Sequence, residues 1–247
     1  MWAIIPAAGK GSRIQPLAFS KELLPVGLRK EHGMSPRPVS DYLIERLVRG
    51  GASRLCFVIA PGKSDILEYY GGSAHTNRIC YAVQPQPLGL CDAIFRAVPF
   101  VDLSSPVLVG LPDTIWFPVD ALTTLPDDRF SFLLFPVEDP EHFDSVLMDE
   151  AGRVQRIDVK SSSPQTNWVW GAFKFPGSIL RELYELWLER DRSDEYFGTL
   201  ANAWIDRGGT AFGVGAGTSY LDVGTTDSYL RTLQVLNHSN EAAGSTM

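Results

Sequence analysis

The chain has 247 residues, of which 45% are hydrophobic and 21% are charged, and its formal net charge is −7. This length suffices for one α/β domain with a large core. The acidic balance argues against a nucleic-acid partner, because phosphate contacts usually require a basic face, but it leaves a nucleotide ligand open. No apolar run approaches the length of a membrane span and the N-terminus lacks a signal-peptide pattern, so we expect no membrane partner.

Three cysteines bear on the redox compartment. Cys56, Cys80 and Cys91 are odd in number and show no C-x-x-C spacing. We expect them to be reduced, buried and structural, as in a cytoplasmic protein, and we expect no zinc site.

The first half of the chain alternates strand-like and helix-like segments, which predicts βαβ units and a mixed, mostly parallel sheet flanked by helices. Continuous apolar runs predict strands over residues 2–5, 55–60, 79–83 and 107–111. Apolar periodicity predicts helices from Val39 to Gly50, over 63–70 with Ser64 as N-cap, and over 90–98. The segment from Leu28 to Arg37 is predicted to be an inserted loop.

The second half changes character. Strands are predicted over 132–137, 168–175, 210–214 and 220–223, with a hairpin of 145–148 and 154–159. Helices are predicted around 180–188, over 196–206, and from about 225 to Leu236. We therefore expect a single domain over residues 1–237 and a flexible tail over 238–247.

The loop after the first strand is the most informative segment. Its small residues Ala7, Ala8 and Gly9 leave backbone N–H groups free to approach a phosphate or a base closely. Three cations follow on or just after the loop, namely Lys10, Arg13 and Lys21. Glycine-rich backbone with fixed positive charges is what a polyphosphate needs.

Two common phosphate loops do not fit this segment. A Walker A loop needs Ser or Thr directly after the lysine, and here Gly11 separates Lys10 from Ser12. The dinucleotide fingerprint needs a third Gly or Ala, and Ile14 stands at that position. The P-loop ATPase and the dehydrogenase interpretations are therefore disfavoured.

The loop instead resembles the opening of the sugar-1-phosphate nucleotidyltransferases, G-x-G-[ST]-R-[LM]…K-x-L-L-P-[VI]. The matching residues are Gly9-Lys10-Gly11-Ser12-Arg13-Ile14 and Lys21-Glu22-Leu23-Leu24-Pro25-Val26. The resemblance implies a Rossmann-like nucleotide-diphospho-sugar transferase fold. It also implies that Arg13 and Lys21 are catalytic and stabilise the transition state. The nucleotide-binding residues that it implies in this loop are Ala7, Ala8, Gly9, Lys10, Gly11 and Ser12.

A second motif lies between a predicted strand and a helix, Gln84-Pro85-Gln86-Pro87-Leu88-Gly89-Leu90-Cys91-Asp92-Ala93. It resembles the family segment Q-x-x-P-x-G-[LT]-x-x-A, in which the Gln side chain and the Gly backbone read the nucleotide base. The amide of Gln84 offers a donor and an acceptor, which match N3–H and O4 of uracil or thymine. Taken alone, the segment also fits an ordinary proline-rich loop.

Two aspartates follow predicted strands. Asp113 comes after 107–111, and Asp222 lies in Tyr220-Leu221-Asp222-Val223-Gly224-Thr225. Each could be an ordinary turn or strand-end residue. Both motifs resemble family segments whose aspartates bind the catalytic Mg²⁺, with Asp113 also catalytic, and carboxylates suit that ion. Pro112 replaces the family glycine, which restricts the loop before Asp113.

The acceptor half of the chain departs further from the family. Lys160 matches the lysine that meets the acceptor phosphate, and Gly171 matches a family glycine. The family glutamate that holds sugar hydroxyls is Val159 here, and Asp144-Ser145 stands where the family usually has Gly-Val. The resemblance thus implies an altered acceptor pocket.

The resemblance covers residues 2 to about 227 and implies Mg²⁺-dependent transfer of a nucleotidyl group from an NTP to a sugar 1-phosphate, with dTTP or UTP favoured. NDP-sugar and pyrophosphate would be the products. One alternative is a cytidylyltransferase acting on phosphocholine, if Trp168 and Trp170 formed a box around the ammonium group. Another is a non-catalytic nucleotide- or sugar-phosphate-binding module, motivated by Pro112 and Val159. The sequence does not determine the acceptor, the NTP or the oligomeric state.

Overall fold

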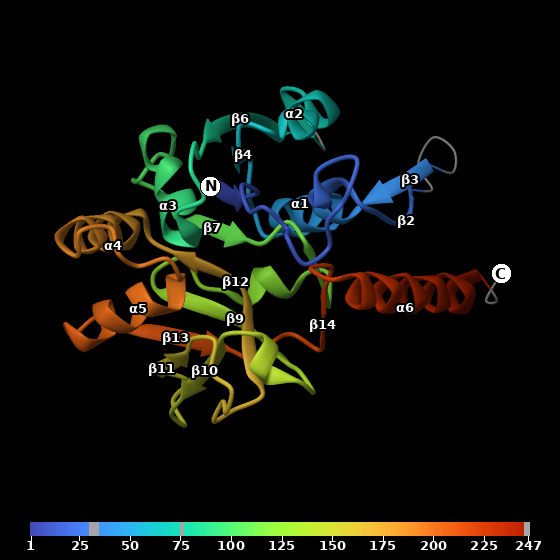
Figure 1. The fold of residues 1–247 in the computed structure, drawn as a ribbon. Helices are drawn as coiled ribbons and strands as arrows, with labels where there is room; N and C mark the ends of the chain where they lie inside the picture. The colour runs from blue at the N-terminus through green and yellow to red at the C-terminus, as the bar shows by residue number, and fades with distance from the viewer. Residues whose placement is uncertain (30–34, 75–76, 245–247) are drawn as a thin grey trace.

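The computed structural model describes residues 1–29, 35–74 and 77–244 (Figure 1). Its strands are β1 (Trp2–Pro6), β2 (Pro25–Arg29), β3 (Ser35–Pro38), β4 (Arg54–Ile59), β5 (Ser73–Ala74), β6 (Asn77–Val83), β7 (Val107–Gly110), β8 (Thr114–Phe117), β9 (Phe130–Pro136), β10 (Ser145–Met148), β11 (Val154–Asp158), β12 (Trp168–Phe175), β13 (Ala211–Val214) and β14 (Ser219–Asp222). Its α-helices are α1 (Val39–Arg49), α2 (Ser64–Tyr70), α3 (Gly89–Arg96), α4 (Gly177–Glu189), α5 (Phe197–Asp206) and α6 (Thr226–Gly244).

Ten of the described strands form one large sheet in the order β11-β10-β12-β7-β1-β4-β6-β5, with β9 beside β12 and β13 beside β9. The other four form two separate two-stranded sheets, β8–β14 and β2–β3. Strands β7, β1, β4 and β6 are parallel neighbours, whereas β12 joins β7 and β9 in antiparallel fashion. This arrangement confirms the predicted fold class, a mixed sheet with a parallel centre.

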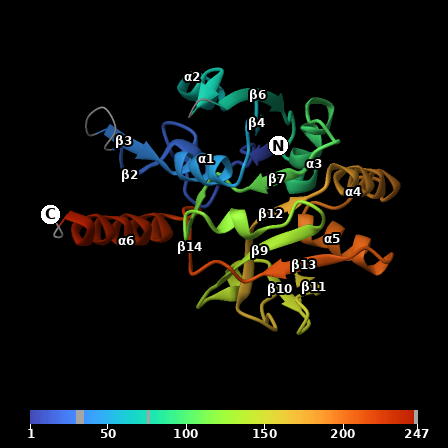
Figure 2. The same cartoon turned by 180° about the vertical axis from the view of Figure 1, so that it is seen from behind.

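Helices cover both faces of the sheet, and β1 shows why. Its residues Ala3 and Ile5 pack with α1, while Ile4 between them packs with α3, α4 and α5. Successive side chains of a strand point to opposite faces, so an apolar run buries both. Both views show α3, α4 and α5 gathered at one end of the molecule, away from α1 and α6 (Figures 1 and 2).

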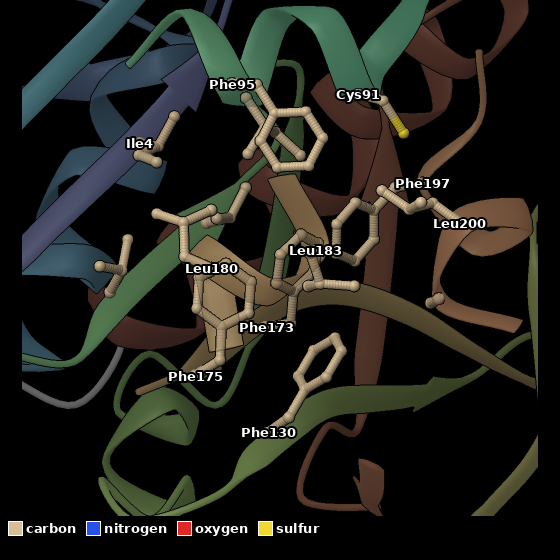
Figure 3. Packing of buried hydrophobic residues seen from close by; sticks show 14 of the residues in the cluster. Ile4, Cys91, Phe95, Phe130, Phe173, Phe175, Leu180, Leu183, Phe197 and Leu200 are labelled. Carbon is tan, nitrogen blue, oxygen red and sulfur yellow. The ribbon is translucent and has the colours of Figure 1, made fainter. Parts of the chain in front are cut away.

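Aromatic rings fill the larger core, between β9, β12 and helices α4 and α5. Phe173 stacks on Phe197 with ring centroids 4.3 Å apart and parallel planes, and Phe130 packs edge-on against Phe175 (Figure 3). All four rings are fully buried. Such packing fixes β9 and β12 relative to the parallel strands, and β12 carries Gly171 toward the candidate site.

Several boundaries differ from the predictions. The predicted loop from Leu28 to Arg37 contains much of an antiparallel β2–β3 pair, although residues 30–34 lie outside the described part. Ser64 is the first helical residue of α2, and Lys63 takes the cap position without a side-chain bond. Helix α6 runs to Gly244, past its predicted end near Leu236. The predicted flexibility of 238–247 stays a prediction.

Strand β8 was not predicted at all. Its partner is β14, which lies about one hundred residues later in the chain, so no local sequence pattern predicts the pairing.

The three cysteines are free as predicted, with Cys56 and Cys91 buried and Cys80 partly exposed. Within the described ranges, no helix has the length and apolar character needed to cross a membrane.

Candidate active site

The two predicted metal ligands lie side by side. β14 pairs with β8 in antiparallel register, with Asp222 opposite Thr114. The ladder continues one step further, because the backbone N–H of Val223 donates to the carbonyl oxygen of Asp113 at 2.9 Å. Asp113 and Asp222 therefore lie at the same end of this two-stranded sheet, near enough for the charge of Asp113 to act on the carboxyl group of Asp222.

Lys21 reaches Asp113 from the short 3-10 helix Lys21–Leu23. Its Nζ forms an ion pair with Oδ2 of Asp113, and both side chains are largely buried, 14% and 16% exposed. Burial works to raise the pKa of Asp113, but the charge and hydrogen bond of Lys21 outweigh it and hold that pKa below its usual value. Asp113 is therefore held as a carboxylate.

Asp222 is less well neutralised. Burial raises its pKa first, and the nearby charge of Asp113 raises it further, while the backbone N–H of Gly224 donates to Oδ2 at 3.1 Å. No residue in the described part of the chain forms an ion pair with Asp222. The charges of Arg13 and Lys21 act against this rise of the Asp222 pKa, but burial and the charge of Asp113 outweigh them.

Arg13 approaches the same corner from the loop after β1. A Cβ atom added to Gly224 would lie 2.8 Å from Oδ2 of Asp222 and 3.0 Å from a terminal guanidinium nitrogen of Arg13. Glycine at 224 thus leaves room for both groups. The structure therefore brings together all four residues predicted to be catalytic or metal-binding, which are Arg13, Lys21, Asp113 and Asp222.

Gly9 and Gly11 in the loop after β1 have different surroundings. Gly11 has a φ of +62°, and an added Cβ would lie 2.8 Å from Cδ of Lys21, so glycine lets the lysine stem pass beneath the loop. An added Cβ at Gly9 would meet nothing within 4 Å, so Gly9 borders open space. The backbone N–H of Ala7 is not free, because it donates to the carbonyl oxygen of Val58 at 2.8 Å.

The other predicted nucleotide-binding residues of this loop lie beyond Ala7. Ala8 is buried, whereas Lys10 and Ser12 are exposed. Of the predicted backbone contacts, the one from the Ala7 N–H is not free for a ligand in this geometry, since it is bonded to the neighbouring strand. For the other loop residues, nucleotide binding stays a prediction.

Glu22 is a site-supporting residue that the motif did not reveal. Its side chain is 1% exposed and receives both Nζ contacts of Lys63, at 2.7 and 2.8 Å. The hydroxyl of Ser40 donates to the Glu22 carbonyl oxygen at 2.6 Å. Two neighbouring residues of the motif therefore have different partners. Lys21 pairs with Asp113, whereas Glu22 bonds to Ser40 of α1 and to Lys63 at the start of α2.

Gln84 is held by two acceptors. Its amide nitrogen donates to the carbonyl oxygen of Gly89 at 3.0 Å and to Oδ2 of Asp92 at 2.9 Å. Since neither partner can donate, the amide orientation is fixed and its two N–H groups are used. Only Oε1 of Gln84 is left for a ligand, so the predicted use of both a donor and an acceptor is wrong for this geometry. Asp92, which sequence reasoning missed, is itself paired with Arg96 at 3.0 Å.

Gly89 has a structural reason to be glycine. Its φ is +90°, and an added Cβ would lie 2.5 Å from the carbonyl oxygen of Glu195. That oxygen accepts the backbone N–H of Leu90 at 2.8 Å. Glycine is therefore required here because the start of α3 packs closely on the segment before α5. This packing requirement holds independently of any contact with a nucleotide base.

Gly171, one of the two predicted acceptor residues, lies against the ring of Tyr220. An added Cβ at Gly171 would be 2.5 Å from Cε2 of Tyr220, so glycine makes room for this ring. Phe143 packs edge-on against the same ring with centroids 5.6 Å apart. Burial raises the pKa of Tyr220, and the charges of Asp222, Asp113 and Asp144 act in the same direction. Tyr220 therefore connects the aspartate pair to the acceptor side.

Lys160 is exposed and lies beside Asp144. Its backbone N–H donates to Oδ1 of Asp144 at 3.2 Å, and its Nζ is 3.9 Å from the same oxygen. Burial raises the pKa of Asp144, although Lys160 opposes the shift. Its Nζ also lies 5.9 Å from the ring centroid of Tyr196, and the exposed ammonium group is accessible to an anionic ligand.

The tryptophans form no ammonium box. Trp170 is 6% exposed and packs against Phe132 and Phe173 within the main core. Trp168 is packed against the same core, and its ring also borders Gly215. The observation that motivated a phosphocholine acceptor is therefore absent, because Trp170 is a core residue.

Comparison with known proteins bears on this arrangement. The family model described as nucleotidyl transferase matches residues 2–239. The glucose-1-phosphate thymidylyltransferase of Neisseria gonorrhoeae is 26% identical over 238 residues, covering 92% of this chain and 80% of the relative. The low-salt glycan biosynthesis nucleotidyltransferase Agl11 of Haloferax volcanii is 30% identical over 75% of this chain and 52% of its own length.

A solved structure, the UTP-bound UGPase from Acinetobacter baumannii, has a TM-score of 0.76 at 20% identity, covering 100% of this chain and 99% of that one. This likeness concerns the fold, and it agrees with the mixed sheet and its flanking helices.

Proposed function

The chain belongs to the nucleotidyl transferase family, and from this premise we propose that it transfers a nucleotidyl group from dTTP or UTP to a sugar 1-phosphate. The products would be an NDP-sugar and pyrophosphate. The observation that carries the proposal is the meeting of Asp113 and Asp222 beside Lys21 and Arg13. The thymidylyltransferase relatives support a sugar 1-phosphate as acceptor.

The reaction needs positioning and charge neutralisation more than proton transfer. A sugar phosphate is already anionic, so its oxygen can attack without a general base. The obstacle is repulsion between this anion and the triphosphate, as in other phosphoryl-type transfers. In this proposal Arg13 and Lys21 stabilise the charge that develops on the leaving pyrophosphate, Lys10 assists at the outer phosphates, and Lys160 binds the acceptor phosphate.

We propose Asp113 and Asp222 as the ligands of Mg²⁺, which would neutralise charge on the α-phosphate and the incoming phosphate. The donor set fits this ion: two carboxylates stand side by side, and Mg²⁺ is usually held by one or two carboxylates plus substrate oxygens and water. The described residues offer no cluster of three metal-ligating side chains. That agrees with an ion held partly by the substrate.

Base recognition rests on Gln84 in this proposal. Because both its N–H groups are engaged, Oε1 selects a base that presents a donor, such as N3–H of uracil or thymine. The 4-amino group of cytosine could also donate there, so Gln84 alone does not separate CTP from UTP. Choice among pyrimidines then depends on backbone groups of the loop after β1.

Pyrophosphate release across a matrix of NTPs and acceptors tests the proposal. The acceptors are hexose 1-phosphates and phosphocholine, and each NTP is also assayed alone. We expect release only when both substrates and Mg²⁺ are present, and the highest rates with dTTP or UTP and a hexose 1-phosphate. Absence of release in every combination, or release with CTP and phosphocholine alone, would overturn it.

A further inference from the structure

Asp144 lies on the acceptor side of the site, and only one of its two carboxylate oxygens has a hydrogen-bond partner among the described residues. Its side chain is 9% exposed, and Oδ1 accepts the backbone N–H of Lys160 at 3.2 Å. No described residue forms a hydrogen bond with Oδ2. Oδ2 is not among the fully buried, unpartnered polar atoms of the described residues, so this oxygen is open to a hydrogen-bond donor that enters from the solvent side.

The fold places Asp144 at the site. Ser145 pairs with Asp158 across the β10–β11 ladder, so Asp144 and Val159 come next on the two chains, directly before Lys160. The adjoining Phe143 packs on the ring of Tyr220, two residues from Asp222. Asp144 therefore lies between the exposed cation of Lys160 and the ring that leads to the aspartate pair.

Val159 makes no polar contribution here. Its Cγ2 packs against α5 so closely that a Cβ atom added to Gly198 would lie only 2.7 Å from it. The side chain of Val159 therefore packs on α5. A polar acceptor ligand then finds no hydrogen-bonding side chain at 159. The nearest carboxylate on the neighbouring strand is that of Asp144.

We propose that Asp144 is a specificity-determining residue of the acceptor pocket, whose Oδ2 accepts a hydrogen bond from a hydroxyl group of the acceptor while Lys160 holds its phosphate. This inference rests on the proposed function and names the acceptor class more closely: a phosphate ester with a hydroxyl group within reach. A neutral donor suits the position, because Lys160 already places a positive charge 3.9 Å from the Asp144 carboxylate. A second cation would be repelled by that lysine.

Direct binding separates this role from catalysis. Calorimetry of the whole chain compares α-D-glucose 1-phosphate with inorganic phosphate, which can occupy Lys160 but carries no sugar hydroxyl. Asp144→Asn should weaken glucose 1-phosphate binding about tenfold or more, the size of a lost charge-assisted hydrogen bond, and should not weaken inorganic phosphate binding. Lys160→Ala should weaken both ligands.

Asp158→Asn is the matched control. Asp158 is a similarly buried carboxylate on the neighbouring strand, but both its oxygens are engaged: Oδ2 accepts the backbone N–H of Gln165 at 3.2 Å, and Oδ1 lies 3.4 Å from Nε of the exposed Arg156. Its variant should therefore bind both probes like the wild type. Equal weakening of both probes in Asp144→Asn, or no weakening of either, would overturn the inference. So would wild-type protein that binds glucose 1-phosphate no better than phosphate.

The two claims fail in different ways. Wild-type protein that releases no pyrophosphate with any substrate pair removes the proposed function, whatever the calorimetry shows. Pyrophosphate release by the wild type, with an unchanged acceptor KM in Asp144→Asn, removes only the role of Asp144.

Discussion

Asp113 and Asp222 are distant in the chain and adjacent in the fold, because the β8–β14 ladder sets Asp222 opposite Thr114 and Val223 bonds back to Asp113. Of these two aspartates, Asp113 alone forms an ion pair with a lysine among the residues that the structure describes. This asymmetry explains why one carboxylate is held ionised by Lys21 while the pKa of the other is raised by burial and by its neighbour. A divalent cation would complete the charge balance of the pair.

The first prediction concerns Asp222. Asp222→Asn keeps the shape of the side chain but removes a charge that we assign to metal binding. We expect turnover to fall by about 100-fold or more, the size expected for losing a transition-state electrostatic contact. Steady-state pyrophosphate release measures this, with Asp158→Asn as control. Turnover within a few-fold of wild type would exclude Asp222 from the catalytic machinery.

Arg13 provides the second prediction. The guanidinium lies near Asp222 and Gly224 and would face the phosphates. Arg13→Ala should lower kcat by about 100-fold, and Arg13→Lys should retain part of the activity, because a point charge replaces a fork of donors. Arg49→Ala, at an exposed residue paired with Glu45 on α1, should leave kcat unchanged. Equal effects of the Arg13 and Arg49 substitutions would contradict the assignment.

The third prediction tests how Gln84 is oriented. Asp92→Ala removes one of the two acceptors that fix its amide. We expect the KM for the NTP to rise about tenfold, with a smaller change in the acceptor KM, because the base contact loses its preset geometry. Initial-rate kinetics with each substrate varied in turn give both constants. A rise confined to the acceptor KM would refute a role for Asp92 in base recognition.

Two glycines give a matched pair for stability. An alanine Cβ at Gly171 would lie 2.5 Å from Tyr220 and 2.7 Å from Phe135, both rings in the interior. We therefore expect Gly171→Ala to lower the free energy of unfolding by about 1–3 kcal/mol. Gly9→Ala meets open space and should leave stability nearly unchanged. Denaturant unfolding compares the two, and equal stabilities would show that the Tyr220 ring moves aside freely.

The last mutational prediction concerns Glu22 and Lys63. Lys63→Met leaves Glu22 buried without its cation, which should cost about 3–5 kcal/mol of unfolding free energy. The double variant Glu22→Gln with Lys63→Met should recover part of that loss, because no unpaired charge stays inside. Chemical denaturation measures each variant. A double variant less stable than Lys63→Met would contradict this explanation.

Local patterns predicted most of the fold. We could identify β1, β4 and β7 from their apolar runs and α1 from its apolar periodicity. A strand or helix that buries one or two faces needs apolar residues at regular positions, and this pattern is visible in the sequence. β8 shows no such pattern, since its short segment is defined by pairing with β14. The β2–β3 pair was hidden by its prolines and charges.

The candidate site was predictable only as far as the motifs reach. Arg13, Lys21, Asp113 and Asp222 lie in segments with fixed spacing, and the structure brings them together. The side chains that support or complete the site carry no matching motif position. Lys63 pairs with Glu22 and Asp144 lies beside Lys160 through contacts that only the tertiary structure makes. Asp92 lies within the second motif, but the motif does not show that its carboxylate accepts from the Gln84 amide.

The most direct test of the central claim is the Mg²⁺ dependence of pyrophosphate release from dTTP or UTP with glucose 1-phosphate, measured on wild type and Asp222→Asn. We predict no release by the wild type in EDTA, release that rises and saturates as Mg²⁺ is added, and at least about 100-fold less release by the variant at any Mg²⁺ concentration. Release that persists in EDTA, or a variant that matches the wild type, would contradict the assignment of Asp113 and Asp222 as a metal-binding pair.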